Sequence, residues 1–268
     1  IIMNIMILGD IVGAPGRDVL RRKINGIIKD KKIDFLIVNG ENAADDGKGV
    51  TKEIVKEFYE LGVDVVTSGN HIWDKPEIVN YISDENRLLR PANLADGSPG
   101  KGYEVYLTKD KKFKVAVINL MGNVFMRKTE DVFISANKIQ KKIKLQESAD
   151  FIVVDFHGEI TSEKMAMGHF FDGKATMLVG THTHVPTADS RILINGTAYQ
   201  TDIGMCGDYD SVIGMNKENS IKKFLKQKDS VNHFPAEGKA TLSGLIVEAD
   251  IKTGLAKKIE RYIGGEVF

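Results

Sequence analysis

Two histidines one residue apart, His182 and His184, follow an apolar run that ends in Gly180. Residues i and i+2 of an extended chain point the same way, so both imidazoles can reach one point in space. Imidazole is the commonest metal ligand among protein side chains. The pair therefore predicts a metal site at the end of a buried strand, which we place at residues 175–179.

Other side chains that can bind metals also follow apolar runs. They are Asp10, Glu41, Asn42, Asn70, His71 and His157. Carboxylates, amide oxygens and imidazoles together suit borderline divalent metals such as manganese, iron, cobalt and zinc. These donors outnumber the ligands of one tetrahedral ion, and a carboxylate such as Glu41 can bridge two ions about 3.5–4 Å apart. The residue types therefore favour a dinuclear metal site.

The apolar runs at 4–8, 34–39 and 63–67 predict strands, and helical spacing of apolar residues predicts a helix after each of the first two. These strands are continuously apolar, which favours a sheet covered on both faces. Open α/β sheets bind ligands at the carboxyl ends of their strands. Most of the candidate ligands in the first 71 residues stand at such ends.

The rest of the chain predicts further elements. Helices are expected at 76–82, 135–148, 161–170 and 220–226, and strands at 103–107, 114–120, 151–156, 175–179, 191–194, 197–199, 242–249 and 255–263. The Asn195-Gly196 pair is a strong hairpin turn signal. We expect a mostly antiparallel C-terminal half and a single domain of residues 1–268. The loop-rich segment 86–108 is a candidate lid.

Composition restricts the class of protein. Lys plus Arg and Asp plus Glu number 37 each, so the formal net charge is zero and no global basic surface for duplex nucleic acid is expected. The single cysteine, Cys206, cannot form an internal disulfide, which fits a reducing compartment. No apolar run approaches the roughly 18 residues of a membrane helix. We expect a cytoplasmic protein without a membrane partner, and we consider a homo-oligomer although no apolar stripe requires one.

Several strings of residues carry a family resemblance. Gly9-Asp10, Gly69-Asn70-His71 and the Gly-Thr-His-Thr-His string at 180–184 resemble the motif series of calcineurin-like metallophosphoesterases. The fuller strings GDIVGAPGR, GNHIWDK, RPAN, DFHGEITSEK and GTHTHVPTAD are more similar to the YmdB-like phosphodiesterases. The chain departs from the wider superfamily because no histidine stands two residues after Asp10 and because Glu41 replaces an aspartate. Both departures are features of the YmdB-like subfamily.

The resemblance implies a fold and a ligand set. The fold is a four-layer α/β/β/α sandwich, with two mixed β-sheets flanked by helices. Two metal ions, iron or manganese, are expected. The first would be held by Asp10, Glu41, Asn42 and His184, and the second by Glu41, Asn70, His157 and His182. His71 is expected to act on the leaving oxygen of the substrate rather than on metal.

The resemblance also implies a phosphodiester substrate, with 2′,3′-cyclic nucleotides favoured, and attack by a hydroxide that bridges the metals. Further candidates for substrate contacts are Arg17, Arg90, Asn93 and His169. One alternative is a phosphomonoesterase or 5′-nucleotidase, which only the shape of the pocket would distinguish. Another is a non-catalytic nucleotide- or RNA-binding regulator that retains the metal fold, although the intact ligand set argues against pure binding.

Overall fold

The structure, a computed structural model, describes residues 2–266; the predicted domain of 1–268 also includes residues 1, 267 and 268, which lie outside the described residues. The strands are β1 (Ile2–Val12), β2 (Phe35–Asn42), β3 (Val65–Thr67), β4 (Tyr103–Leu107), β5 (Lys114–Met121), β6 (Phe151–His157), β7 (Met177–Thr181), β8 (Arg191–Ile192), β9 (Ala198–Gln200), β10 (Met205–Asp208), β11 (Ala240–Asp250) and β12 (Ala256–Gly265). The helices are α1 (Gly13–Asp30), α2 (Lys52–Glu60), α3 (Pro76–Asp84), α4 (Val132–Lys142), α5 (Thr161–Phe171) and α6 (Lys217–Phe224).

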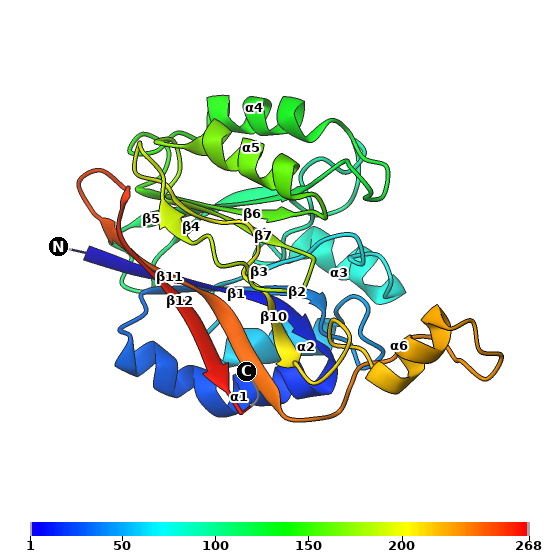
Figure 1. Cartoon of the computed structure of the whole chain (residues 1–268). Helices are drawn as coiled ribbons and strands as arrows, with labels where there is room; N and C mark the ends of the chain where they lie inside the picture. The colour runs from blue at the N-terminus through cyan, green and yellow to red at the C-terminus, as the bar shows by residue number, and fades with distance from the viewer. Residues whose placement is uncertain (1, 267–268) are drawn as a thin grey trace.

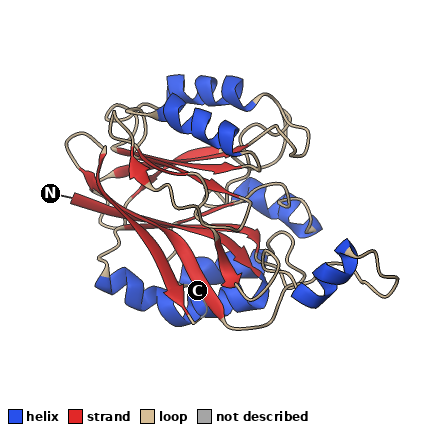
Figure 2. Cartoon of the chain, viewed as in Figure 1, coloured by secondary structure: helices blue, strands red, loops and turns tan. Residues whose placement is uncertain are grey.

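The strands form two six-stranded sheets that lie face to face between helices (Figures 1 and 2). The first sheet has the order β12-β11-β10-β1-β2-β3, and the second has the order β4-β5-β6-β7-β9-β8. Both are mixed: β1 pairs in parallel with β2 and antiparallel with β11, and β5 pairs in parallel with β6 and antiparallel with β4. The predicted four-layer sandwich is confirmed.

Side-chain alternation along β1 explains why the sheets stack. Successive residues of a strand point to opposite faces, and both faces of β1 are apolar. Ile5 and Ile7 belong to the core between the two sheets, together with residues of β6 and β7. Met6 and Leu8 belong to the core beneath α1 and α2. A strand of this composition is stable only when both faces are covered.

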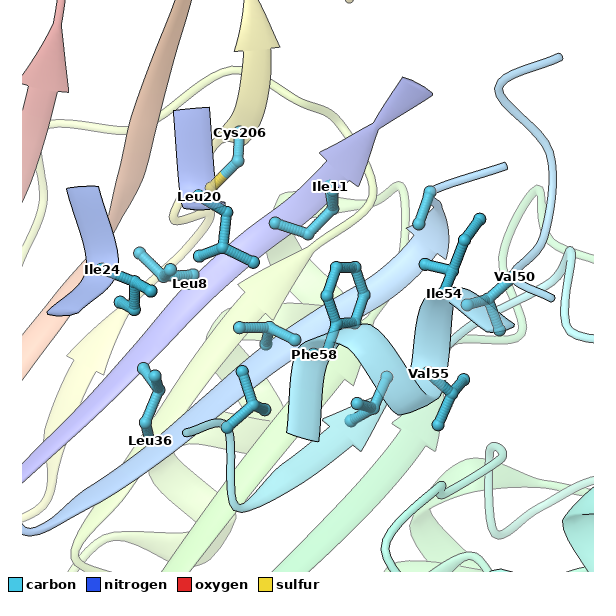
Figure 3. Packing of buried hydrophobic residues seen from close by; sticks show 14 of the residues in the cluster. Leu8, Ile11, Leu20, Ile24, Leu36, Val50, Ile54, Val55, Phe58 and Cys206 are labelled. Atoms are coloured by element: carbon cyan, nitrogen blue, oxygen red, sulfur yellow. The ribbon is translucent and has the colours of Figure 1, made fainter. Parts of the chain in front are cut away.

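Helices cover the outer face of each sheet. Figure 3 shows Leu20 and Ile24 of α1 and Phe58 of α2 packed over Leu8 and neighbouring side chains of the first sheet. The outer face of the second sheet is covered by α4 and α5 through a third core cluster. None of the helices in residues 2–266 combines the length and the apolar character that a bilayer crossing requires.

Several predicted boundaries were wrong. The helix expected at 135–148 is α4, which begins earlier because the Asp131 carboxylate accepts the Ile134 N–H at 2.8 Å. It ends at Lys142 because Ile143 is extended. The helix expected at 220–226 is likewise displaced, because the Asn216 side chain caps α6.

The C-terminal half is less antiparallel than predicted. Strand β9 pairs in parallel with β7, and β10, which the apolar pattern did not indicate, pairs in parallel with β1. Both are short strands of three and four residues that complete sheets begun earlier in the chain. Strand β9 lies between β7 and β8, and β10 lies between β11 and β1, so their pairing depends on strands distant in the sequence.

The segment 86–108 is attached to both sheets. Leu88 bridges Val66 near the end of the first sheet, and the Ala92 N–H donates to the Asn119 carbonyl of the second sheet at 2.8 Å. The last part of the segment is the edge strand β4. A role for this segment as a lid stays a prediction.

Candidate metal centre

The predicted ligands come from the carboxyl ends of strands in both sheets. Asp10 lies near the end of β1, and Glu41 and Asn42 end β2. Asn70 follows β3 in the same sheet. In the second sheet His157 ends β6, and His182 and His184 follow β7. Because the parallel strands of the two sheets end on one side of the molecule, their terminal residues meet there. We call these seven residues the ligand cluster.

One part of the ligand cluster gathers around His184. Its Nε2 lies 3.1 Å from Asn42 Oδ1 and 3.8 Å from Asp10 Oδ1. The other ring nitrogen, Nδ1, donates to the carbonyl of Ile213 at 2.7 Å. That bond leaves Nε2 as the free nitrogen, which is the arrangement of a metal-binding histidine whose tautomer is set by a second partner.

The other part gathers around His157. Its Nε2 lies 3.1 Å from Asn70 Oδ1, 3.1 Å from His182 Nδ1 and 3.5 Å from Glu41 Oε1. Asp10 joins the two parts, since its Oδ1 is 3.8 Å from His157 Nδ1 as well as from His184. The structure therefore brings all seven predicted ligands together.

The donor spacing suits metal ions. Two ligands about 2.1 Å from a shared ion lie about 3.0–3.4 Å apart at angles between right and tetrahedral. The three contacts of 3.1 Å around His157 and His184 have this spacing. Counting only His, Cys, Asp and Glu, no group of three or more within residues 2–266 is arranged to hold a metal ion. Two of the three 3.1 Å contacts involve the amide oxygens of Asn42 and Asn70.

One atom of the ligand cluster lacks a partner. Asp10 is fully buried, and its Oδ1 accepts no hydrogen bond from the described part of the chain. An unpaired buried carboxylate oxygen is costly. Its Oδ2, by contrast, accepts the N–H of His182 at 3.1 Å. A cation beside Oδ1 would supply the missing interaction, so the residues present fit a metal.

Burial also sets the protonation states. It raises the pKa of Asp10 and raises the pKa of Glu41 to about 7. It lowers the pKa of His157 to about 4 and that of His182 to about 2. Both imidazoles are therefore neutral at pH 7, the form that binds metal. Positive charge at this point would offset the cost of burying the carboxylates.

A buried relay orients His157. Its Nδ1 lies 2.9 Å from Thr181 Oγ1, and the Thr181 hydroxyl donates to the carboxylate of Asp155 at 2.8 Å. Asp155 also accepts hydrogen bonds from Thr67 and Asn39, at 2.5 and 2.9 Å. Nδ1 must then be the protonated nitrogen, which directs the lone pair of Nε2 toward the ligand cluster. The relay joins strands of the two sheets.

The turn that carries the two C-terminal ligands is strained. His182 and His184 have φ values of 100° and 67°, a region that residues other than glycine rarely adopt. Between them, Thr183 donates its N–H and its hydroxyl to Asp202 Oδ2, at 3.0 and 2.8 Å. The buried ammonium group of Lys164 donates to the same oxygen at 2.8 Å. This buried ion pair holds the turn in place.

His71 lies beside the ligand cluster but is held differently. Its N–H donates to Glu41 Oε1 at 2.6 Å, and its ring Nδ1 lies 2.6 Å from Asp74 Oδ2. The second oxygen of Asp74 is 3.3 Å from the guanidinium of Arg127. With Nδ1 occupied by Asp74, Nε2 is the nitrogen available to a substrate. Glu41 accepts the Gly69 N–H through its other oxygen.

The ligand cluster opens into a cavity of about 410 Å³. Its polar lining includes Glu41, Asn42, His71, Glu159, His182 and His184. Residues 212–233 contribute Val212, Ile213, Met215, Ser220, Phe224 and His233, and Gly47, Lys48 and Thr183 complete the lining. The volume is that of a small-molecule site, for which about 300–1,000 Å³ is usual.

Known proteins are similar to this chain over nearly its whole length. The sequence model of the family described as "YmdB-like protein" matches residues 6–262. The chain belongs to the YmdB-like family. It is 46% identical over 261 residues to a protein of Bacillus subtilis (strain 168) named "2',3'-cyclic-nucleotide 2'-phosphodiesterase", with 97% of each chain covered.

Two solved structures of similar proteins have the same fold. A phosphatase from Mycoplasma pneumoniae is 35% identical, with a TM-score of 0.91 and coverage of 100% of this chain and 95% of that one. A hypothetical protein from Thermus thermophilus is also 35% identical, with a TM-score of 0.89 and coverage of 98% and 100%. The resemblance to the YmdB-like family that the motifs indicated is thus confirmed.

The further substrate candidates lie elsewhere in this YmdB-like chain. Arg17 donates to the Ala43 carbonyl and pairs with Asp45 at 2.6 Å. Arg90 donates to three carbonyls of its own loop, and buried Asn93 donates to the Met121 carbonyl at 2.7 Å. His169 is exposed on α5. Among the described residues, the lining of the cavity includes none of these four. Their contact with substrate stays a prediction.

Several residues of the site were missed from the sequence. Asp74 stands three positions after His71, and Asp155 interrupts an otherwise apolar strand; both spacings were visible signals. Glu159, whose Oε2 lies 3.3 Å from His182 Nε2, belongs to the same string as His157. Lys164 ends the same string, but its burial is recognisable only from the packing around it, and Asp202 gave no signal.

Proposed function

We propose that this chain hydrolyses phosphodiesters with two bound metal ions, and that its substrates are 2′,3′-cyclic nucleotides cleaved at the 2′ ester bond. The observation that carries the proposal is the convergence of seven candidate metal-binding side chains from both sheets, four of which line one cavity together with His71. The relative from B. subtilis is named for this reaction. The intact ligand cluster favours catalysis over a purely regulatory role.

We assign the residues of the ligand cluster to two ions. Asp10, Asn42 and His184 would hold one ion, Asn70, His157 and His182 the other, and Glu41 would contact both. Bound there, two cations supply a water molecule of lowered pKa and positive charge for the phosphoryl oxygens. We propose iron or manganese, since mixed carboxylate, amide and imidazole donors suit borderline metals. The cytoplasmic location and the homo-oligomer stay predictions.

His71 is proposed as the general acid. In the reaction the P–O2′ bond breaks while a new P–O bond to water forms, and O2′ requires a proton as it leaves. His71 lines the cavity, and Asp74 occupies its Nδ1, which leaves Nε2 for the substrate. As the imidazolium, with the Asp74 carboxylate accepting from Nδ1, His71 would carry on Nε2 the proton that O2′ requires. The product is the 3′-monophosphate.

The proposal is tested by comparing substrates on protein loaded with manganese or iron. We expect turnover of bis(p-nitrophenyl) phosphate and of 2′,3′-cyclic AMP to exceed turnover of p-nitrophenyl phosphate, with 3′-AMP as the nucleotide product. Preference for the monoester would indicate a phosphomonoesterase instead. No turnover of any of the three, with two ions bound per chain, would contradict an enzymatic role.

A further inference from the structure

The lining of the cavity has two chemically different parts. One part is polar and consists of four members of the ligand cluster, Glu41, Asn42, His182 and His184, together with His71. The other part comes from residues 212–233, in and around α6, and includes four apolar side chains. These are Val212, Ile213, Met215 and Phe224, which we call the apolar wall. In Figure 1, α6 projects from the body of the molecule at the end where the strands of the first sheet terminate.

Ile213 occupies a strained position in the apolar wall. Val212 and Met215 exchange backbone hydrogen bonds of 2.9 and 3.0 Å, closing a two-residue turn at Ile213 and Gly214. Both turn residues have positive φ, 51° and 88°. Glycine adopts this conformation readily, but a β-branched residue rarely does. Strained positions of this kind cluster where a side chain has a task in binding or catalysis.

Packing in the core does not offset the strain at Ile213, because this residue is 52% exposed. Its carbonyl instead accepts the Nδ1–H of the ligand His184 at 2.7 Å. The same residue thus fixes the tautomer of a metal ligand and places an apolar side chain in the cavity. This hydrogen bond therefore joins the apolar wall directly to the ligand cluster.

Phe224 presents an aromatic ring to the same cavity. It ends α6 and is 81% exposed, so most of the ring has no protein partner. Aromatic side chains stack on nucleobases of any sequence, because every base has a π-face. Ser220 and His233 line the cavity nearby and offer polar groups to the edge of a base.

We propose that the apolar wall binds the nucleobase of the substrate, with Phe224 stacking on the base and Ile213 packing against it. The phosphate then lies over the ligand cluster, beside His71. This inference rests on the proposed function and adds the reason for its nucleotide specificity. The wall contributes to binding through the base alone, so it discriminates nucleotides from phosphodiesters that lack a base.

The test compares 2′,3′-cyclic AMP with 1-O-methylribose 2′,3′-cyclic phosphate, which has the same reacting group and no base. We expect wild-type protein to show a KM for the nucleotide roughly tenfold lower, as one stacked base implies. Phe224→Ala raises the KM for the nucleotide about tenfold and leaves kcat and the base-free substrate unchanged. Phe224→Trp restores the low KM.

Leu225 provides a matched control. It is the next residue, is 64% exposed, and is absent from the lining of the cavity among the residues described. Leu225→Ala should leave both KM values unchanged. Equal KM values for the two substrates in wild type, or equal effects of Phe224→Ala and Leu225→Ala, would overturn the inference while leaving the phosphodiesterase intact.

Equilibrium binding separates this inference from the proposed function. If the metal-loaded protein turned over neither substrate, the proposed activity would fail, but 3′-AMP and ribose 3-phosphate still probe the wall. Roughly tenfold weaker binding of 3′-AMP to Phe224→Ala, with ribose 3-phosphate unaffected, supports the wall. Equal affinity of wild type for the two ligands refutes it.

Discussion

The two parts of the site, the ligand cluster and the apolar wall, are built in opposite ways. The ligand cluster is buried: Asp10 and His157 are 0% exposed and Glu41 is 1% exposed. The apolar wall is largely open, with Ile213 at 52% and Phe224 at 81% exposed. The cluster draws on five strands of two sheets, whereas the wall belongs to one segment between β10 and β11. Around one cavity, the two sheets cover most of the ligand cluster, whereas much of the apolar wall is open to solvent.

This difference in burial suits the two parts to different tasks, which are catalysis for the ligand cluster and substrate recognition for the apolar wall. Metal ligands must be held within a fraction of an ångström, which the Asp155–Thr181–His157 relay and the Lys164–Asp202 pair accomplish. A side chain that only covers a base tolerates more motion, and surface segments carried on a rigid scaffold commonly supply such contacts. Changes in the cluster should therefore abolish turnover, and changes in the wall should alter only which substrates bind.

Glu41→Gln is the substitution expected to have the largest effect. Its carboxylate is the proposed bridge between the ions, and an amide cannot replace that charge. We expect the metal content to fall and turnover to drop about a thousandfold, equivalent to several kcal/mol of transition-state stabilisation. Metal analysis and kcat/KM for 2′,3′-cyclic AMP measure this. Asp45→Asn, at a carboxylate 85% exposed nearby, is the control and should change neither quantity. Full metal content and turnover in Glu41→Gln would contradict the assignment.

His71→Ala should separate chemistry from metal binding. Because His71 donates its backbone N–H to Glu41 and an alanine retains that group, both ions should remain bound. Turnover should fall about 10²- to 10⁴-fold, the usual contribution of a general acid. Asp74→Asn, which removes only the partner of Nδ1, should cost less, about 10–100-fold. Loss of metal in His71→Ala, or unchanged turnover with both ions present, would rule out the general-acid role.

Ile213→Gly tests the wall and should have the smallest effect. Glycine accepts the positive φ of 51°, so the relief of about 1–3 kcal/mol of strain offsets the loss of a half-exposed side chain. We expect an unfolding free energy equal to or above that of wild type, and a KM for cyclic nucleotides raised about threefold. Urea denaturation and steady-state kinetics measure these. Ile194→Gly, at a residue 96% exposed in another turn, controls for the greater flexibility of glycine in the unfolded chain. A clear loss of stability specific to Ile213→Gly would show that the strained turn serves the fold.

The contrast between the ligand cluster and the apolar wall also explains which parts of the site could be predicted from the sequence. The candidate ligands could be grouped from the sequence because they lie at or near the ends of apolar strands, and parallel strands of a covered sheet bring their carboxyl ends together. Their binding of metal stays a prediction. The pairing of Asn42 and Asn70 with particular ions came from the family resemblance, since spacing alone does not distinguish a ligand amide from a turn residue. The family and the four-layer fold are confirmed.

The apolar wall was not predicted, for a physical reason. Ile213, Met215 and Phe224 lie in a segment whose position depends on long-range contacts, such as the His184–Ile213 hydrogen bond and the bridge between Met215 and Pro235. The spacing of apolar residues within the segment does not reveal such long-range contacts. Helix α6 was expected within three residues of its true start, but nothing in its sequence indicated that its last residue lines the cavity beside the ligand cluster.

The most direct test of the account is the metal dependence of turnover. Protein stripped with a chelator should lose hydrolysis of 2′,3′-cyclic AMP and regain it on addition of manganese or iron, reaching full activity at two ions per chain. That stoichiometry is the result predicted by the two parts of the ligand cluster. Undiminished hydrolysis by protein shown to be free of metal would contradict it.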